Sequence, residues 1–343
     1  MVRLRPRGEK VRNYILRNIR GHPTDIVKIA AERFGITRQA INKHLQKLVS
    51  ESALTQAGRT RNRSYNLAPL VEWNQEYEVS GLAEDVIWRN DVTSVIGKKL
   101  ENVLDIWNYG FTEMLNNAID HSGGSMVRVS IKKTAVDSEM IISDNGVGIF
   151  KKIQSALNLL DERHAVLELA KGKLTTDPQA HTGEGIFFTS RVFNSFEILS
   201  GGVYFSHKFA EAEDWILQSN YEGQGTTVYM KLNNHTARTT KAIFKQFSSG
   251  GDFGFNKTVV PVKLAQYEND KLISRSQAKR LLARVDLFKV VMFDFKDVEI
   301  IGQAFADEIF RVFPQIHPEI ELLSFNANED VAEMVKRAEG NRE

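Results

Sequence analysis

The sequence predicts a multidomain α+β protein, and three observations support this prediction. The chain has 343 residues, which is enough for two or three domains of ordinary size. Its 42% hydrophobic and 26% charged residues are typical of globular proteins and exclude a wholly disordered chain. Its apolar residues recur at helical spacing near the start, and strand-like and helix-like runs alternate further along.

The composition also excludes several classes of protein. Because the chain has no cysteine, it holds no disulfide scaffold, no cysteine-ligated metal site and no catalytic thiol. No apolar run approaches the roughly 18–20 residues of a membrane span. The basic N-terminus lacks the apolar stretch of a signal peptide. We therefore expect a cytoplasmic protein that does not enter a membrane.

Charge is divided unevenly along the chain, although the whole sequence carries only +2. Residues 1–70 contain fifteen lysines and arginines and four acidic residues, a net charge of +11, and the remainder carries −9. A basic module joined to an acidic body indicates a polyanionic partner for the module alone. A solvated basic tail would carry the same charge, so the module must be folded for this interpretation to hold.

The basic module has the pattern of three short helices. Apolar residues at helical spacing predict a first helix over about residues 9–20. Thr24 is expected to cap a second helix, Gly35 permits a tight turn, and Thr37 is expected to cap a third helix. The inward stripe of the third helix is predicted to be Ile41, Leu45 and Leu48. Its opposite face carries side chains of the types that bind base edges and phosphates: Arg38, Gln39, Asn42, Lys43 and Gln46.

Two short strand-like runs follow, around a basic tip that carries Arg59, Arg61 and Arg63. A helix-turn-helix followed by a basic hairpin can place one helix in the major groove and the hairpin on the DNA backbone. Residues 1–70 resemble the winged-helix domain of bacterial repressors. The resemblance implies binding to double-stranded DNA, although many winged helices dock on proteins instead. It also implies a homodimer, because such domains commonly bind paired half-sites.

Polar residues of two motifs suggest a ligand site in the middle of the chain. Glu113 and Asn117 are four residues apart, so on a helix both project from one face. A carboxylate there can polarise water, and an amide oxygen beside it can complete the shell of a phosphate-bound Mg²⁺. Asp144 follows an apolar strand and can accept a hydrogen bond from an exocyclic amine. Gly146 and Gly148 then let the backbone approach a flat ring.

A third motif contains Thr182, Gly183 and Gly185 just before an apolar helix. Backbone N–H groups at such a helix start can hold anionic phosphates. Further on, Thr226 enters an alternating strand, where its hydroxyl can reach the same base. The sequence has neither a Walker motif nor a complete dinucleotide fingerprint, so these two phosphate-binding folds are not supported.

In this order and spacing, over about residues 80–235, the motifs resemble the N, G1 and G2 boxes and the trailing Gly-Thr of the GHKL, or Bergerat-fold, ATP-binding superfamily. The resemblance implies an α/β sandwich over residues 71–240 that binds ATP and Mg²⁺. It makes Glu113 the general base, Asn117 the Mg²⁺ ligand and Asp144 the adenine reader. Residues 150–182 would correspond to the ATP lid, where Lys173 either reaches the γ-phosphate or stays solvated. The glycines would shape the adenine pocket (Gly146, Gly148) and the phosphate loop (Gly183, Gly185).

Residues 250–343 alternate strand-like and helix-like runs, which predicts an α/β domain with helices covering a sheet. Strands are predicted at 258–262, 290–295 and about 320–325, and helices at 276–285, 303–313 and 330–338. Residues 293–306 resemble the STAS fold of anti-sigma antagonists. In that family a serine near the start of this helix accepts phosphate, whereas here Gln303 and Ala304 hold these positions. A protein partner can dock at this domain.

Three functions are compatible with this order of domains. The first is an ATP-binding transcriptional regulator, in which nucleotide occupancy of the GHKL domain controls DNA binding by the winged helix. The second is a protein serine/threonine kinase of the anti-sigma type that acts on a separate STAS partner. The third is an ATPase that drives assembly. The fusion of a basic DNA-binding module to an ATP site favours the first function, and Glu113 is compatible with both hydrolysis and sensing.

Overall fold

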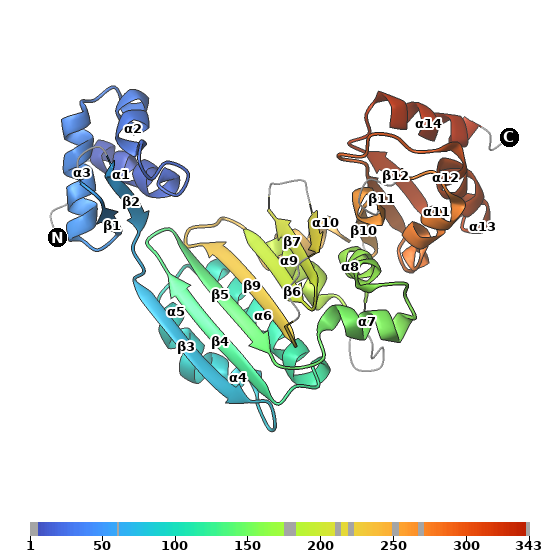
Figure 1. Cartoon of the computed structure of the whole chain (residues 1–343), viewed down its shortest axis with the longest axis horizontal. Helices are drawn as coiled ribbons and strands as arrows, with labels where there is room; N and C mark the ends of the chain where they lie inside the picture. Colours follow the sequence, from blue (N-terminus) through green and yellow to red (C-terminus); the bar gives the residue numbers. More distant parts are fainter. Residues whose placement is uncertain are drawn as a thin grey trace.

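The computed structural model describes residues 6–59, 62–174, 183–209, 214–218, 223–248, 254–266 and 271–340. The chain forms an N-terminal helical unit, a central unit built on a large sheet, and a C-terminal α/β unit (Figure 1). Within the described ranges, no helix is long and apolar enough to cross a membrane.

The N-terminal unit consists of three helices followed by an antiparallel hairpin. The helices are α1 (Pro6–Asn18), α2 (Ile26–Phe34) and α3 (Arg38–Ser50), and the hairpin strands are β1 (Leu54–Ala57) and β2 (Ser64–Leu67). The predicted inward stripe of α3 is buried in a separate apolar core, together with residues from α1, α2 and the hairpin. This unit therefore has a core of its own.

The ends of these helices agree with the sequence prediction in part. Helix α1 begins three residues early, at Pro6, because proline is well accommodated in a first helical turn. Thr37 caps α3 as predicted, with its Oγ1 accepting a hydrogen bond from the Ala40 N–H at 3.2 Å. The predicted cap of α2 is wrong: Asp25, not Thr24, is at the N-cap, and it makes no side-chain cap bond. Its carboxylate instead lies 3.1 Å from the His22 Nδ1.

The central unit contains a seven-stranded antiparallel sheet in the order β3-β4-β5-β9-β6-β7-β8. Its strands are β3 (Val71–Glu78), β4 (Met126–Lys133), β5 (Asp137–Asp144), β6 (Ser195–Ser200), β7 (Val203–Lys208), β8 (Asp214–Gln218) and β9 (Thr226–Asn233). Strand β9 alternates buried and half-buried residues, as its sequence predicts. One face of the sheet is therefore apolar and the other is polar.

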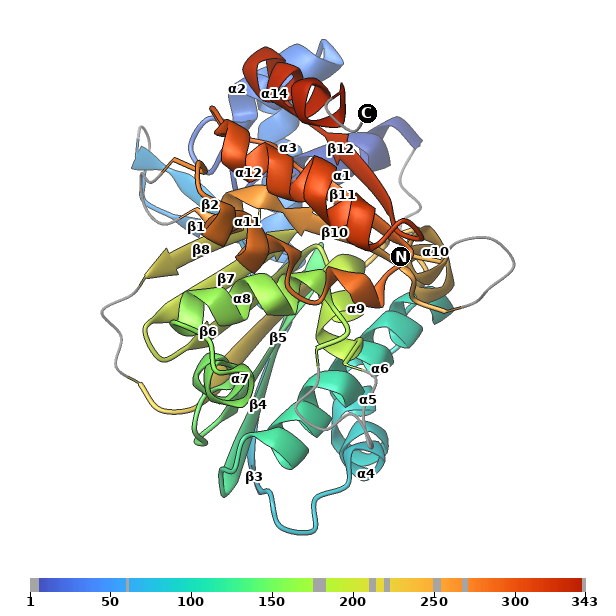
Figure 2. The ribbon, with the colours of Figure 1, turned by 90° about the vertical axis from the view of Figure 1, so that its right-hand side faces the viewer.

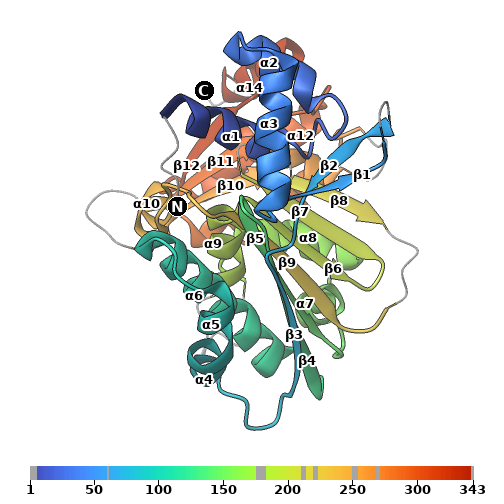
Figure 3. The ribbon, with the colours of Figure 1, turned by 90° about the vertical axis from the view of Figure 1, so that its left-hand side faces the viewer.

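Helices cover the apolar face, and they lie behind the sheet in Figure 1. They are α4 (Glu84–Ile87), α5 (Thr93–Ile96), α6 (Glu101–Asn116), α9 (Gly185–Val192) and α10 (Thr240–Gln246), with π-turns η2 (Trp88–Val92) and η3 (Asn117–His121). In the part of the chain that the structure describes, the polar face carries no helix of the central unit (Figure 3). The N-terminal unit lies at one end of that polar face.

The C-terminal unit has a parallel sheet in the order β10-β11-β12, with helices on one face. Its strands are β10 (Lys257–Pro261), β11 (Val290–Asp294) and β12 (Glu321–Phe325), close to the predicted positions. The helices are α11 (Arg275–Leu282), α12 (Gln303–Asp307), α13 (Phe313–Ile316) and α14 (Glu329–Gly340), and shorter turns are η4 (Val262–Ala265), η5 (Val285–Leu287) and η6 (Glu308–Val312). The predicted helix at 303–313 is thus α12 continued through a π-turn into α13.

Helices α7 (Ile149–Leu157) and α8 (Glu162–Lys171) follow β5; α7 packs on α8, and α8 packs on β10 and η4 of the C-terminal unit. Helix α8 lies between the central sheet and the C-terminal helices (Figure 2), and its residues 165–171 are all buried. A single apolar core extends from Ile87 to Ala338 through both units. The C-terminal unit is therefore packed onto the central unit rather than attached by a flexible linker.

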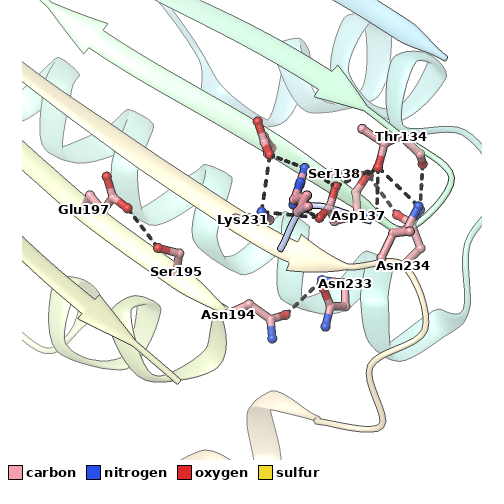
Figure 4. A network of polar contacts seen from close by, with 12 residues as sticks. Thr134, Asp137, Ser138, Asn194, Ser195, Glu197, Lys231, Asn233 and Asn234 are labelled. Carbon is pink, nitrogen blue, oxygen red and sulfur yellow. Dashed lines mark hydrogen bonds and ion pairs between the residues drawn. The ribbon is translucent and has the colours of Figure 1, made fainter. Parts of the chain in front are cut away.

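A polar network joins the N-terminal unit to the outer face of the central sheet. Arg20, which follows α1, forms an ion pair with the Asp137 carboxylate and lies 3.0 Å from Glu139 Oε1. Lys231 of β9 lies 3.4 Å from the Asp137 carboxylate and 3.6 Å from that of Glu139. Thr134 completes the network by donating to Asp137 Oδ1 at 2.7 Å (Figure 4). The N-terminal unit is thus held at the first residues of β5.

Candidate functional site

A cavity of about 350 Å³ opens in the central unit, where five elements converge. Its walls come from the C-terminal end of α6 with η3, the end of β5, the start of α7, the start of α9 and the start of β9. This volume falls within the range of small-molecule sites, which is roughly 300–1,000 Å³. Most of the motif residues singled out in the sequence line it: Glu113, Asn117, Asp144, Gly183, Gly185 and Thr226.

Glu113 and Asn117 line the cavity together, as their spacing predicts. Phe111 and Leu115 are buried on the opposite face of α6, so the polar residues of the last turn face the cavity together with Met114. The Asn117 N–H still bonds to the Glu113 carbonyl oxygen, so α-helical spacing holds up to the point where π-turn η3 begins. Turns of this kind often occur at functional sites.

Asp144 lies at the end of β5 with its carboxyl group fixed from two sides. Its Oδ1 accepts hydrogen bonds from the backbone N–H groups of Gly146, at 2.9 Å, and Thr226, at 3.2 Å. Burial raises the pKa of Asp144, and these backbone hydrogen bonds oppose the rise. Thr226 Oγ1 accepts from the Ile149 N–H at 3.0 Å, so its hydroxyl hydrogen remains as a donor. The pair presents an acceptor and a donor to one wall of the cavity.

Gly146 and Gly148 shape the loop after β5 rather than line the cavity. A Cβ atom at Gly146 would collide with the Ser122 carbonyl oxygen. Gly148 has φ +96°, and a Cβ there would lie 2.7 Å from Ser200 Oγ. Glycine is required at both positions, because a Cβ atom would overlap with Ser122 at residue 146 and with Ser200 at residue 148.

Gly185 begins α9 and lies against Glu113. A Cβ at Gly185 would come within 3.0 Å of Glu113 Oε2, which is closer than real Cβ contacts. Gly183 has φ +70°, and its carbonyl oxygen accepts a hydrogen bond from the Leu174 N–H at 3.0 Å. The start of α9 thus meets the carboxylate at the end of α6, and the preceding glycine is paired with the chain that follows α8.

Other predicted residues lie away from the cavity or outside the described ranges. The Lys173 amino group donates to the Leu287 carbonyl oxygen at 2.8 Å, and it lies 4.8 Å from the centre of the Phe288 ring. Both partners belong to the C-terminal unit, and Lys173 does not line the cavity. Thr182 and Arg61 lie outside the described residues. Of the segment 150–182, residues 150–174 form most of α7, α8 and the chain after α8.

Several residues that sequence reasoning missed also line the cavity. Asn116 directly precedes Asn117, His121 follows it by one turn, and Lys152 brings a positive charge to the wall. The Lys152 amino group donates to the His121 carbonyl oxygen at 2.6 Å, which holds it beside η3. The signal for Lys152 was its place one helical turn after Gly148, at the mouth of the predicted ring-binding loop.

The residues predicted to contact DNA lie on the surface of the N-terminal unit. Arg38, Gln39 and Lys43 of α3 are exposed, and Asn42 beside them is half-buried. At the hairpin tip, Arg59 is exposed and Arg63 is half-buried. Helix α3 lies on the side of the unit that faces the viewer in Figure 3.

Two segments of the chain match known families. Residues 109–236 match the family of histidine kinase-, DNA gyrase B- and HSP90-like ATPases. Residues 277–332 match a STAS-like domain of unknown function (DUF4325). A comparison of the chain with curated proteins gives no match. The chain therefore contains a GHKL-type ATPase domain and a C-terminal STAS-like domain.

Proposed function

We propose that this protein is an ATP-binding regulator of transcription, in which nucleotide in the GHKL-type domain controls DNA binding by a winged helix formed by residues 1–70. One observation carries the proposal. Strand β5 ends at Asp144 in the cavity, and its first residue, Asp137, binds Arg20 of the N-terminal unit. A single strand therefore connects the cavity to the unit that is proposed to bind DNA.

The residues that line the cavity suit ATP with Mg²⁺. The Asp144 carboxylate and the Thr226 hydroxyl offer the acceptor and donor that an adenine edge needs. Asn117 offers an amide oxygen that can complete the shell of a phosphate-bound Mg²⁺, and Glu113 beside it offers a carboxylate that can polarise water. Bound Mg²⁺ would neutralise phosphate charge, and the backbone N–H groups at the start of α9, with Lys152, would orient the phosphate oxygens.

The N-terminal unit suits double-stranded DNA. Its three helices and basic hairpin have the order of a winged helix, and residues 1–70 carry a charge of +11. The exposed face of α3 supplies Arg38, Gln39 and Lys43 for base edges and phosphates. Arg59 and Arg63 at the hairpin supply positive charge for contacts with the DNA backbone. We expect a homodimer on paired half-sites.

DNA binding with and without nucleotide tests the proposal. An operator is first selected in vitro with the full chain, and its affinity is measured by fluorescence anisotropy with and without a non-hydrolysable ATP analogue and Mg²⁺. We expect the analogue to change the affinity of the wild type and to have no effect on Asp144→Ala. Calorimetry establishes that the analogue binds the wild type. Equal DNA affinities with and without bound analogue would exclude nucleotide control.

A second function, ATP hydrolysis, is favoured by the position of Glu113 against Gly185 at the start of α9. A carboxylate there can act as a general base for water. If so, Glu113→Gln abolishes phosphate release and keeps nucleotide binding. Label transferred from ATP to a separate STAS protein, in place of free phosphate, would instead identify a kinase. Within the chain, the position of the phosphorylated serine is held by Gln303 and Ala304.

A further inference from the structure

We infer that the STAS-like domain positions the phosphate-binding part of the nucleotide site, and that Arg284 is the positioning residue. The inference rests on the proposed binding of ATP and assigns a regulatory input to that site. We define the stem as residues 172–174, which follow α8, together with residues 183–184, which lead into α9. Contacts of the STAS-like domain fall on this stem.

Arg284, which follows α11, reaches the stem directly. Its guanidinium donates a hydrogen bond to the Lys173 carbonyl oxygen, and its Nη1 lies 3.3 Å from Glu168 Oε2 on α8. The Lys173 side chain returns the contact, because its amino group donates to the Leu287 carbonyl oxygen at 2.8 Å. Each of the two side chains therefore donates to a backbone carbonyl oxygen in the other's segment: Arg284 to that of Lys173, and Lys173 to that of Leu287.

The stem transmits this contact to the start of α9. The Leu174 N–H donates to the Gly183 carbonyl oxygen at 3.0 Å, and Gly183 packs so closely on Leu174 that a Cβ would collide with its backbone. Two residues later, Gly185 lies against Glu113 in the cavity. A shift of Lys173 relative to the cavity therefore moves Leu174, Gly183 and the N–H groups at the start of α9.

Buried charges make the connection rigid. The side chains of Glu168 and Lys171 are each 1% exposed, and Lys171 Nζ lies 2.7 Å from Glu168 Oε1. The Lys171 amino group also donates to the Ala283 carbonyl oxygen at 2.7 Å, and the Thr258 hydroxyl donates to the Lys171 carbonyl oxygen at 2.6 Å. Separation of α8 from the STAS-like domain would keep the pair between Glu168 and Lys171 but break their bonds to Arg284, Ala283 and Thr258, which is unfavourable. Helix α8 and the STAS-like domain therefore move together.

The backbone of Arg284 supports a specific role for its side chain. Arg284 has φ +60°, in the left-handed region that favours glycine and asparagine. A non-glycine residue keeps this strained backbone conformation only where contacts with the surrounding structure stabilise it. The contacts of the Arg284 guanidinium with Lys173 and Glu168 stabilise it here.

The adenine side of the cavity depends on other contacts. Asp144 and Thr226 are fixed by each other and by the loop after β5. The STAS-like domain is therefore expected to act on the phosphates and not on the base. A general loss of stability would instead weaken the binding of every adenine ligand, with or without phosphates.

The test compares ligands that differ only in their phosphates. Adenosine, ADP and a non-hydrolysable ATP analogue, the latter two with Mg²⁺, are titrated into wild type, Arg284→Met and Arg284→Lys by calorimetry or ligand-observed NMR. The matched control is Arg275→Met, which removes an exposed arginine from the same domain. Arg284→Met keeps an aliphatic side chain of similar length and leaves Glu168 paired with Lys171.

We expect Arg284→Met to bind the ATP analogue about tenfold more weakly, ADP less so, and adenosine as the wild type does. Arg284→Lys should lie between the two, and Arg275→Met should match the wild type. Hydrogen exchange should accelerate in Arg284→Met at residues 183–192 and not at 126–144. If Arg284→Met does not fold, Lys173→Met, which removes the bond to Leu287, is compared over the same three ligands.

Equal weakening for all three ligands, or no weakening, would overturn the inference. Failure of the proposed function has a different result, because the wild type would then bind none of the three ligands. In that case the positioning role is also excluded.

Discussion

The carboxylate of Glu113 lies against the α-carbon of Gly185, so that a methyl group on Gly185 would come within 3.0 Å of Glu113 Oε2. These residues are 72 positions apart in the sequence and come from α6 and α9. Their contact places a carboxylate beside the backbone N–H groups of a helix start, where the helix dipole stabilises negative charge. Only glycine fits at residue 185 with Glu113 in this position.

We expect Gly185→Ala to weaken binding of an ATP analogue. The added methyl group must displace the Glu113 carboxylate or the start of α9, so the groups proposed to face the phosphates move, and we expect a loss of roughly tenfold in affinity, about 1.4 kcal/mol of binding free energy. Calorimetry measures the change. The control is Gly340→Ala, because a Cβ at Gly340 meets nothing within 4 Å. Wild-type affinity in Gly185→Ala would contradict the proposed phosphate site.

Nucleotide affinity should fall as the pH is lowered. Burial raises the pKa of Asp144 above its ordinary value, and only the ionised carboxylate accepts freely from an exocyclic amine. The wild type therefore loses affinity as the pH falls toward that raised pKa, and regains it at higher pH. Titrations of ADP from pH 8 to pH 5 test this. Asp144→Asn should bind weakly throughout, and an equal pH dependence in this variant would assign the effect to another group.

Lys171→Met should destabilise the folded chain. The substitution leaves the buried Glu168 carboxylate without its nearest cation, with Arg284 at 3.3 Å and His164 at 3.7 Å still beside it. Breaking a buried pair costs about 3–5 kcal/mol. The matched control is Lys279→Met, whose side chain is 70% exposed and lies 3.9 Å from Glu308. Exposed pairs contribute only about 0–1 kcal/mol. Urea unfolding followed by tryptophan fluorescence measures both, and equal effects would disprove a special role for the buried pair.

Arg20→Ala should remove the effect of bound nucleotide on DNA affinity. Arg20 joins the N-terminal unit to Asp137 and Glu139 on β5, and Lys231 still compensates the two carboxylates after its removal. We expect DNA affinity without nucleotide to stay near the wild-type value, and the change caused by an ATP analogue to disappear. Arg89→Ala is the control, because it breaks an exposed pair with Asp85 that is not linked to the N-terminal unit. A full nucleotide response in Arg20→Ala would remove β5 from the proposed mechanism.

The sequence predicts the site well where the signal is local. Spacing predicts that Glu113 and Asn117 share a helix face, whereas the resemblance to the GHKL superfamily implies that Asp144 joins them, and all three line one cavity. Lys173 differs because its position depends on Leu287, which is 114 residues away. The burial of Lys171 was equally hidden, since a charged helix residue is usually solvated and only the packed STAS-like domain encloses it.

The attachment of Arg20 to the first residues of β5 has a mechanical consequence. Asp137 and Asp144 are separated by about 24 Å of extended chain, and a strand hydrogen-bonded on both sides cannot lengthen. Ligand binding at one end can therefore reach the other only by tilting or twisting the strand with its neighbours β4 and β9. The N-terminal unit would then change its angle to the sheet without any hinge in the chain between the two sites.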